Sequence, residues 1–237
     1  MINTINVKGV SKSYSKIQAL KDIRFFAKKG EVIALLGPNG SGKTTLMNIL
    51  AGVLTPDEGE IFILNKNLEY NKQFIKKHLG FLPEGSPLYG DMKVKDFLTY
   101  MAKLKNVDIA KIKKISKEVK IDNVLEQKIE TLSKGYLRRV SFAQSLLADP
   151  EILLLDEPTD GLDPNQKEVI RDIIKKISAK KTIIISTHLL DDVKTIASKV
   201  LLINNGSIII DGSVDEMLKQ TNTKDIETAF KTLTKEY

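Results

Sequence analysis

Residues 37–44 read Gly37-Pro38-Asn39-Gly40-Ser41-Gly42-Lys43-Thr44, which matches the phosphate-loop pattern G-x-x-x-x-G-K-[ST] at every fixed position. The apolar run Val32–Leu36 ahead of the motif is typical of a buried strand, and the stretch Thr44–Ala51 after it is typical of a helix. Because strand, loop and helix follow in the order that the motif requires, a decorative glycine turn is a poor alternative. The stretch predicts an α/β fold built around a nucleotide.

Each residue type in this loop has a physical reason. Glycine lets successive backbone N–H groups turn inward toward phosphate oxygens, and the helix beginning near Gly42 adds its dipole. Lys43 supplies a positive charge between the β- and γ-phosphates, and the Thr44 hydroxyl is a ligand for Mg²⁺. We therefore expect ATP to contact a continuous run of residues: Gly37, Pro38, Asn39, Gly40, Ser41, Gly42, Lys43, Thr44 and Thr45.

A magnesium–phosphate site also needs a carboxylate, and the chain offers two. The apolar run Ile152–Leu155 predicts a buried strand that ends in Asp156 and Glu157. Ligands of open α/β sheets bind beyond the carboxyl ends of the strands, which favours Asp156 as a magnesium ligand. Glu157, one residue further on, is placed to polarise the attacking water. The alternative is a pair of exposed acids in a loop.

Composition narrows the function classes. The 237 residues include no cysteine, which excludes disulfides, cysteine-ligated zinc and thiol catalysis. The net charge of +7 permits anionic partners, but no basic cluster is interleaved with aromatic residues, so we expect no nucleic-acid partner. The N-terminus resembles no leader peptide, and apolar runs fall far short of a bilayer span. We expect a cytoplasmic protein.

The rest of the chain alternates short apolar runs with amphipathic stretches, as in a mainly parallel sheet covered on both faces. Between Val94 and Val124 strand patterns vanish, and Phe97, Leu98 and Met101 recur at helical spacing, which predicts a helical insertion of roughly 55 residues. The expected strands are Ile5–Val10, Ile23–Ala27, Gly59–Leu64, Glu151–Leu155, Thr182–Ser186 and the hairpin Val200–Ile203 with Ser207–Ile210. The expected helices are Leu137–Leu147, Gln166–Ile177, Leu189–Ile196 and the tail Val214–Tyr237.

Further motifs follow in one order along nearly the whole chain. Together with the phosphate loop they resemble the nucleotide-binding subunits of ABC transporters. Leu132–Tyr136 (LSKGY) resembles the family signature LSGGQ, and the strand ending in Asp156-Glu157-Pro158-Thr159 resembles its Walker B segment. Gly161-Leu162-Asp163 resembles the D-loop, and Ser186-Thr187-His188 resembles the switch histidine.

The resemblance implies roles for these residues. Ser133, Lys134 and Gly135 would contact ATP held by a second cassette, so that a dimer completes each site. Asp163 would serve the D-loop, and His188 would contact the γ-phosphate. Blander alternatives remain open for the signature, which also fits a capped helix start, and for His188, which also fits a structural histidine.

Three further positions carry the comparison with the family. Tyr14 sits where the family places an aromatic ring against adenine, although simple packing is the alternative. Glu84 replaces the usual glutamine of the loop that couples nucleotide to the membrane partner; its carboxylate is still able to hold Mg²⁺ through water. Tyr136 replaces the signature glutamine. Both variants, and the ending Asp225–Phe230, resemble the ABC-2-type export branch with its multidrug-like and gliding-motility-like ATPases.

The resemblance implies a P-loop NTPase fold with a mainly parallel central sheet, an N-terminal antiparallel β subdomain and an inserted helical subdomain. One domain would span 1–237, with a core of 1–85 and 146–220, a helical subdomain of 86–145 and a C-terminal helical tail of 214–237.

The implied function is that of an ATP-hydrolysing subunit that binds Mg²⁺ and ATP in a dimer, identical copies being the favoured form. It would drive export through a separate permease subunit at the inner face of the cell membrane. The segment Glu84–Tyr100 would dock on that permease, and Phe81, Leu88, Tyr89 and Phe97 are either its contacts or ordinary packing. Two alternatives are a soluble single-cassette ATPase of an assembly process and a metabolic kinase with a phosphate acceptor.

Overall fold

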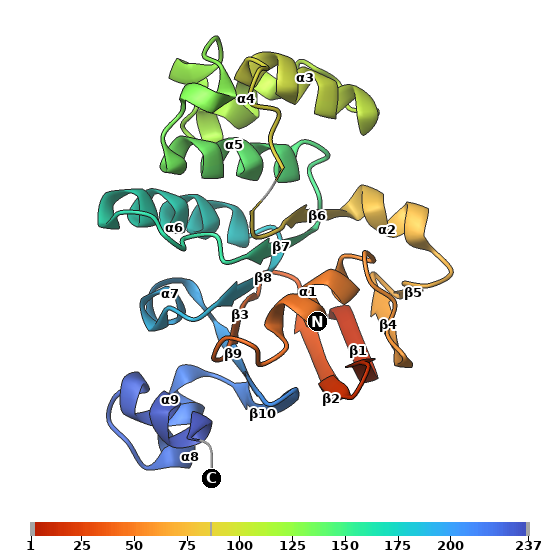
Figure 1. Cartoon of the computed structure of the whole chain (residues 1–237), viewed down its shortest axis with the longest axis vertical. Coiled ribbons are helices and arrows are strands. Elements are labelled where there is room, and N and C mark those ends of the chain that lie inside the picture. Colours follow the sequence, from red (N-terminus) through yellow and green to blue (C-terminus); the bar gives the residue numbers. More distant parts are fainter. Residues whose placement is uncertain (1–2, 86, 236–237) are drawn as a thin grey trace.

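The computed structural model describes residues 3–85 and 87–235 and contains two sheets flanked by helices (Figure 1). The smaller sheet is antiparallel, with strand order β2-β1-β4-β5. Its strands are β1 (Asn3–Tyr14), β2 (Ile17–Lys28), β4 (Glu58–Ile63) and β5 (Lys66–Asn67). This sheet confirms the expected N-terminal antiparallel β region, and its two long strands extend well beyond the predicted Ile5–Val10 and Ile23–Ala27.

The central sheet has six strands in the order β10-β9-β3-β8-β7-β6. All neighbouring pairs are parallel except β10 with β9, which form the predicted hairpin. The strands are β3 (Val32–Leu36), β6 (Leu79–Leu82), β7 (Ile152–Asp156), β8 (Thr182–Thr187), β9 (Lys199–Asn204) and β10 (Ser207–Gly212). A mainly parallel sheet was the expectation for apolar runs that alternate with helices.

Side chains of the central strands alternate between two cores, because successive residues of a strand point to opposite faces. In β7, Ile152 and Leu154 pack with the antiparallel sheet and with α1 (Lys43–Leu50), which contacts both sheets. Leu153 and Leu155 face the opposite core. The helix that follows the phosphate loop is therefore held between two sheets.

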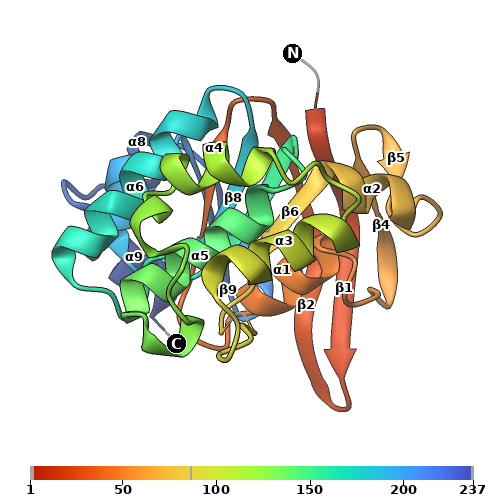
Figure 2. The same cartoon turned by 90° about the horizontal axis from the view of Figure 1, so that it is seen from above.

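The opposite core is formed by helices inserted between β6 and β7 and by the helix after β7. Figure 1 shows these helices stacked on one side of the central sheet, and Figure 2 shows α3, α4 and α5 grouped together. They are α3 (Val94–Leu104), α4 (Lys111–Glu118), the short turns η1 (Asp122–Val124) and η2 (Ile129–Thr131), α5 (Lys134–Leu146) and α6 (Pro164–Ser178). The predicted helical insertion is thus present.

A third, smaller core closes the C-terminal end. Ala34 and Leu36 of β3 pack there with α7 (Leu190–Ile196), α8 (Val214–Thr221) and α9 (Ile226–Thr234). The tail is helical as expected over its described residues, with a break at Asn222, which has left-handed backbone; Tyr237 lies outside the described residues.

The elements expected from the sequence differ from the structure in several places. The pattern missed α2 (Lys72–His78) and the strand β6, both short and without a clear periodic signal. It also placed the start of the signature helix at Leu137, whereas α5 begins at Lys134, because Ser133 is its N-cap and Gly135 lies in its first turn. Among the described residues no helix is both long and apolar enough to cross a bilayer.

Candidate functional site

The carboxyl ends of four parallel strands meet at one edge of the central sheet. The register pairs Leu36 of β3 with Thr187 of β8, and Asp156 of β7 with Ser186 of β8. β6 ends beside them, because Leu82 is paired with Leu155. The loops that leave these ends are the phosphate loop, the turn at Glu157, the turn at His188 and the segment at Glu84. The fold therefore gathers the predicted chemistry at the edge where α/β sheets bind ligands.

The phosphate loop packs against β2. Gly42 has φ of +110°, a left-handed conformation that side chains disfavour, and a Cβ built on it would lie 2.6 Å from the carbonyl oxygen of Ala19. The loop therefore requires glycine here for both conformation and space. The first N–H groups of α1 have no partners within the helix, so the loop presents donors and a positive helix end to an anion.

Lys43 lies inside this loop. Its Nζ donates to the carbonyl oxygens of Gly37, at 2.8 Å, and Pro38, at 3.0 Å, and the residue is only 6% exposed. Burial lowers the pKa of Lys43, while the carboxylates of Glu157, Asp156 and Glu84 act in the opposite direction. A buried ammonium held by two carbonyls and facing carboxylates is a charge prepared for a multiply charged ligand.

The two predicted carboxylates have different surroundings. Asp156 is 1% exposed, and its Oδ1 accepts a hydrogen bond from Ser186 Oγ. Glu157 is also buried, and its Oε2 accepts a hydrogen bond from His188 Nδ1 at 3.1 Å, since an ionised carboxylate cannot donate. Burial raises the pKa of Glu157, and the hydrogen bond and charge of His188, together with Lys43, act in the lowering direction. A glutamate with a raised pKa is suited to accept a proton.

His188 joins two acids rather than standing alone. Its Nε2 lies 3.8 Å from Asp160 Oδ1, while Nδ1 is bound to Glu157. The sequence identified His188 and Glu157 separately, and the structure brings them into direct contact. The contact of His188 with a γ-phosphate stays a prediction beside the alternative of a structural histidine, since both ring nitrogens face carboxylates here.

The backbone at Glu157 is strained. Its φ is +47°, which is uncommon for a residue with a side chain, and its N–H donates to both Ser186 O and Ser186 Oγ at 3.1 Å. This conformation turns the chain sharply at the end of β7.

The signature residues lie at the start of α5. Ser133 and Lys134 are exposed, and the Ser133 side chain makes no capping hydrogen bond within the described chain. Gly135 is buried, and a Cβ there would lie 2.5 Å from Gln166 Oε1. The missing side chain therefore leaves room for Gln166 of α6. Ser133 and Lys134 thus lie at the surface, and the contact of the three signature residues with a second ATP stays a prediction.

A cleft of about 540 Å³ separates this helix from the turn at Glu157. No phosphate-loop residue lines it within the described parts of the chain. Its lining includes Glu84, Lys134, Arg138, Glu157 and Asp160.

The remaining predicted site residues lie at exposed positions or at a helix cap. Tyr14 lies at the tip of the β1–β2 hairpin, 48% exposed, so its stacking on adenine stays a prediction. Thr44 and Glu84 are exposed beside the strand ends. Asp163 caps α6, because its Oδ1 accepts from Gln166 N at 3.0 Å.

Arg138 is the residue that the motifs did not single out. Its guanidinium group donates to the backbone carbonyls of both Asp156 and Glu157. No local pattern marks it, because its partners lie 18 and 19 positions further along the chain.

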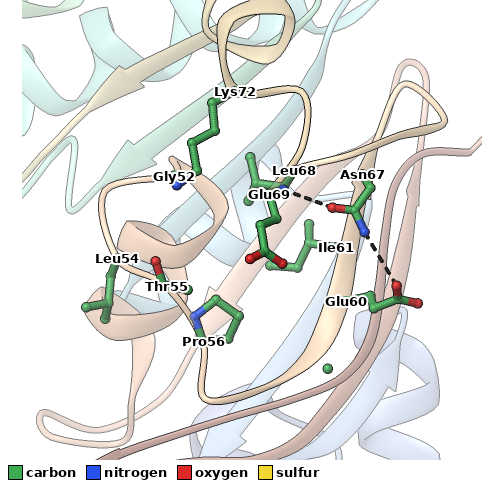
Figure 3. A pocket seen from close by; sticks show the side chains of 11 residues that line it. Gly52, Leu54, Thr55, Pro56, Glu60, Ile61, Asn67, Leu68, Glu69 and Lys72 are labelled. Atoms are coloured by element: carbon green, nitrogen blue, oxygen red, sulfur yellow. Dashed lines mark hydrogen bonds between the residues drawn. The ribbon is translucent and has the colours of Figure 1, made fainter.

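A small cavity of about 50 Å³ lies beyond the C-terminal end of α1, away from the phosphate loop (Figure 3). Asn67 is engaged there with the backbone N–H of Glu69, at 2.9 Å, and with Glu60, at 3.5 Å. Its size and its satisfied polar groups do not suit a substrate.

Comparison with known proteins identifies relatives of the whole chain. A family model described as ABC transporter matches residues 20–160. The sequence is 30% identical to the ABC transporter ATP-binding protein NatA of Bacillus subtilis, over 90% of this chain and 89% of NatA. It is 33% identical to human ATP-binding cassette sub-family A member 9, of which it spans only 14% while 88% of this chain is covered.

Solved structures agree with this result. A structure of the ATP-binding subunit of an ABC transporter has a TM-score of 0.89 and 25% identity, covering 98% of this chain and all of its own. A dimeric bacterial ABC transporter cassette has a TM-score of 0.81 and 25% identity, covering 89% of this chain and 98% of its own.

Proposed function

The chain belongs to the ABC transporter family of ATP-binding cassettes, which are ATPases, and on that premise we propose that it is the ATP-hydrolysing subunit of an export transporter. It binds Mg²⁺ and ATP between two cassettes and drives a separate permease at the inner face of the membrane. The observation that carries this proposal is the hydrogen bond between Glu157 and His188. It lies at the sheet edge where β3 ends and the phosphate loop begins. It joins a proton acceptor to a nucleotide site.

The phosphate loop residues 37–45 hold the triphosphate. Lys43 exchanges its loop carbonyl partners for phosphate oxygens, and the loop N–H groups supply further donors. Glu157 accepts the proton of the attacking water, and His188 orients that carboxylate through Nδ1 while its Nε2 would contact the γ-phosphate.

The residues present fit Mg²⁺. Asp156 is a buried carboxylate that accepts a hydrogen bond from the Ser186 hydroxyl, and a buried charge requires paired charges or a metal ion. Mg²⁺ is bound at such sites through one or two carboxylates and completes its shell with phosphates and water. Thr44, Asp156 and Glu84 would hold the ion. When bound, it neutralises charge on the β- and γ-phosphates.

The second cassette completes the site through Ser133, Lys134 and Gly135. These residues start a 13-residue helix with no acid in its first turn, and the Ser133 hydroxyl is exposed. A helix start of this kind suits the γ-phosphate of ATP bound by another copy. Asp163 would serve as the D-loop residue, in addition to capping α6.

The permease docks beside the loop that carries Glu84. A groove of about 230 Å³ is lined there by Phe81, Leu88 and Tyr89, among others, and Tyr89 is 55% exposed. Phe97 is 2% exposed and packs in the helical core, which favours the packing alternative for this residue. Its buried ring instead supports Tyr89, with ring centres 6.1 Å apart.

Two measurements test the proposal. The purified chain should convert ATP to ADP and inorganic phosphate without phosphorylating an acceptor, which separates it from a metabolic kinase. Affinity purification from detergent-solubilised cells should recover a polytopic membrane protein together with this chain. Recovery with soluble proteins alone would contradict the transporter role and favour the single-cassette assembly ATPase.

A further inference from the structure

Arg138 binds four backbone carbonyls with one side chain. Nη2 donates to Asp156 O at 2.7 Å and to Glu157 O, Nε donates to Pro158 O at 3.2 Å, and Nη1 donates to Pro83 O at 3.3 Å. Three of these carbonyls belong to consecutive residues of the turn after β7. The fourth belongs to the segment after β6, next to Glu84.

These contacts connect parts of the chain that are far apart in sequence. Arg138 lies on α5, about one turn after the signature residues Ser133–Gly135, and α5 packs with the inserted helices. The carbonyls lie at the carboxyl ends of β6 and β7 of the central sheet or directly after them. One guanidinium group therefore joins the helix that starts at the signature to the turn that carries the proposed base and to the loop at Glu84.

The bond to Glu157 bears on a strained residue. Glu157 has φ of +47°, and such a conformation persists only where surrounding structure fixes it. Ser186 holds the N–H of Glu157 from one side, and Arg138 holds its carbonyl from the other. Ser186 and Arg138 together therefore fix the backbone at Glu157, and with it the position from which the Glu157 side chain extends to His188.

Lysine would not replace this side chain. The guanidinium group is planar and presents several donors in fixed directions, whereas an ammonium is a compact charge with a flexible stem. Four carboxylates, those of Asp156, Glu84, Asp160 and Glu157, also favour the positive charge of Arg138 and offset the lowering of its pKa by burial.

We infer that Arg138 is a positioning residue for ATP hydrolysis, which holds the turn at Glu157 in register with the signature helix and with the loop at Glu84. The inference rests on the proposed function, because it assumes that Glu157 accepts the proton of water. It predicts that a displaced signature helix, as on separation of two cassettes, displaces the base through Arg138.

Arg138→Lys and Arg138→Ala test this inference in the full chain by steady-state hydrolysis. Misplacement of a catalytic group costs about 10²-fold in rate, so we expect kcat to fall to this extent for Arg138→Ala and less for Arg138→Lys. KM for ATP should stay unchanged, since the phosphate loop is not touched. Millimolar guanidinium chloride should restore part of the rate of Arg138→Ala, whereas potassium chloride should not.

Lys105→Met provides a matched control. Lys105 also joins α5 to another element, because its Nζ donates to Gln144 O at 2.9 Å, but it is the C-cap residue of α3 and not part of the turn at Glu157. This variant should lose thermal stability and keep its kcat. A folded Arg138→Lys protein with the parent kcat would overturn the inference. So would a kcat loss in Arg138→Ala that is no larger than the loss in Lys105→Met.

Glu157→Gln in the same assay separates the two proposals. If Glu157→Gln stops hydrolysis while the Arg138 variants retain the parent kcat, the proposed function stands and the role of Arg138 is wrong. If Glu157→Gln hydrolyses ATP at the parent rate, the proposed function itself fails.

Discussion

Two regions of the chain differ in how far their side chains are buried and hydrogen-bonded: the strand-end region (Lys43, Asp156 and Glu157) and the signature region (Ser133–Gly135). At the strand ends, Lys43, Asp156 and Glu157 are buried and already hydrogen-bonded. At the signature, Ser133 and Lys134 are exposed, and Ser133 makes no capping bond in the described chain. The proposed function accounts for this difference, since one copy would hold the nucleotide and the signature would act on a ligand that another copy brings.

Lys43→Ala should produce the largest effect, because it removes the charge of the strand-end region. Loss of charge-assisted bonds to phosphate should weaken ATP binding by about 10²-fold or more, measured by equilibrium titration with a fluorescent ATP analogue.

Lys134→Ala is the matched control on the signature side. In a dilute chain it should leave ATP binding unchanged, because Lys134 lines a cleft whose described lining contains no phosphate-loop residue. Equal losses in the two variants would remove the distinction between the regions.

Glu157→Gln should separate binding from chemistry inside the strand-end region. The hydrolysis rate should fall by about 10²–10⁴-fold, because the amide cannot accept a proton from water. ATP should be retained, and a dimer should accumulate in ATP, as seen by size-exclusion chromatography with light scattering. Hydrolysis at the parent rate would show that another group acts as the base.

The pH profile should sharpen the role of His188. Burial raises the pKa of Glu157, so the acidic limb of kcat should lie above that of an ordinary glutamate. The Nδ1–H bond favours the ionised carboxylate, so His188→Ala should move this limb to still higher pH. His78→Ala is the control, because His78 pairs with Glu151 at an exposed site. A limb that moves to lower pH in His188→Ala would contradict the assigned hydrogen bond.

Asp163 should show the smallest effect, on stability. Loss of its N-cap bond in Asp163→Ala should reduce the free energy of unfolding by about 1 kcal/mol, measured by urea denaturation. Asp163→Asn keeps an accepting oxygen and should retain most of that stability. Equal destabilisation by both substitutions would show that charge, rather than capping, matters there.

The sequence was most informative where function requires a local pattern. The phosphate loop and the strand ending in Asp156 were predicted because glycine, lysine and apolar residues must stand at fixed spacing for the fold to bind phosphate. The strand β6 was missed, since four residues carry no periodic signal. The start of α5 was misplaced because glycine disfavours helices in general, whereas Gly135 is required here by its contact with Gln166.

Contacts between residues that are distant in sequence could not be predicted from sequence motifs or periodicity. His188 and Glu157 were each identified, but their hydrogen bond depends on the pairing of β7 with β8. Arg138 had no signal at all, since its partners are carbonyls whose positions no residue type reveals. For Phe97 the sequence leaves permease contact and ordinary packing open, and its place on the buried face of α3 favours packing.

Mixing two defective chains tests the central claim, that each site is shared between two copies. Lys43→Ala removes the phosphate-holding half, and Ser133→Arg blocks the exposed half without disturbing its own core. In a symmetric dimer, a mixed pair keeps one intact site, formed by the phosphate loop of one copy and the signature of the other. We predict that each variant alone hydrolyses almost no ATP and that an equimolar mixture regains a clear fraction of the parent rate. A mixture as inactive as its components would contradict the account.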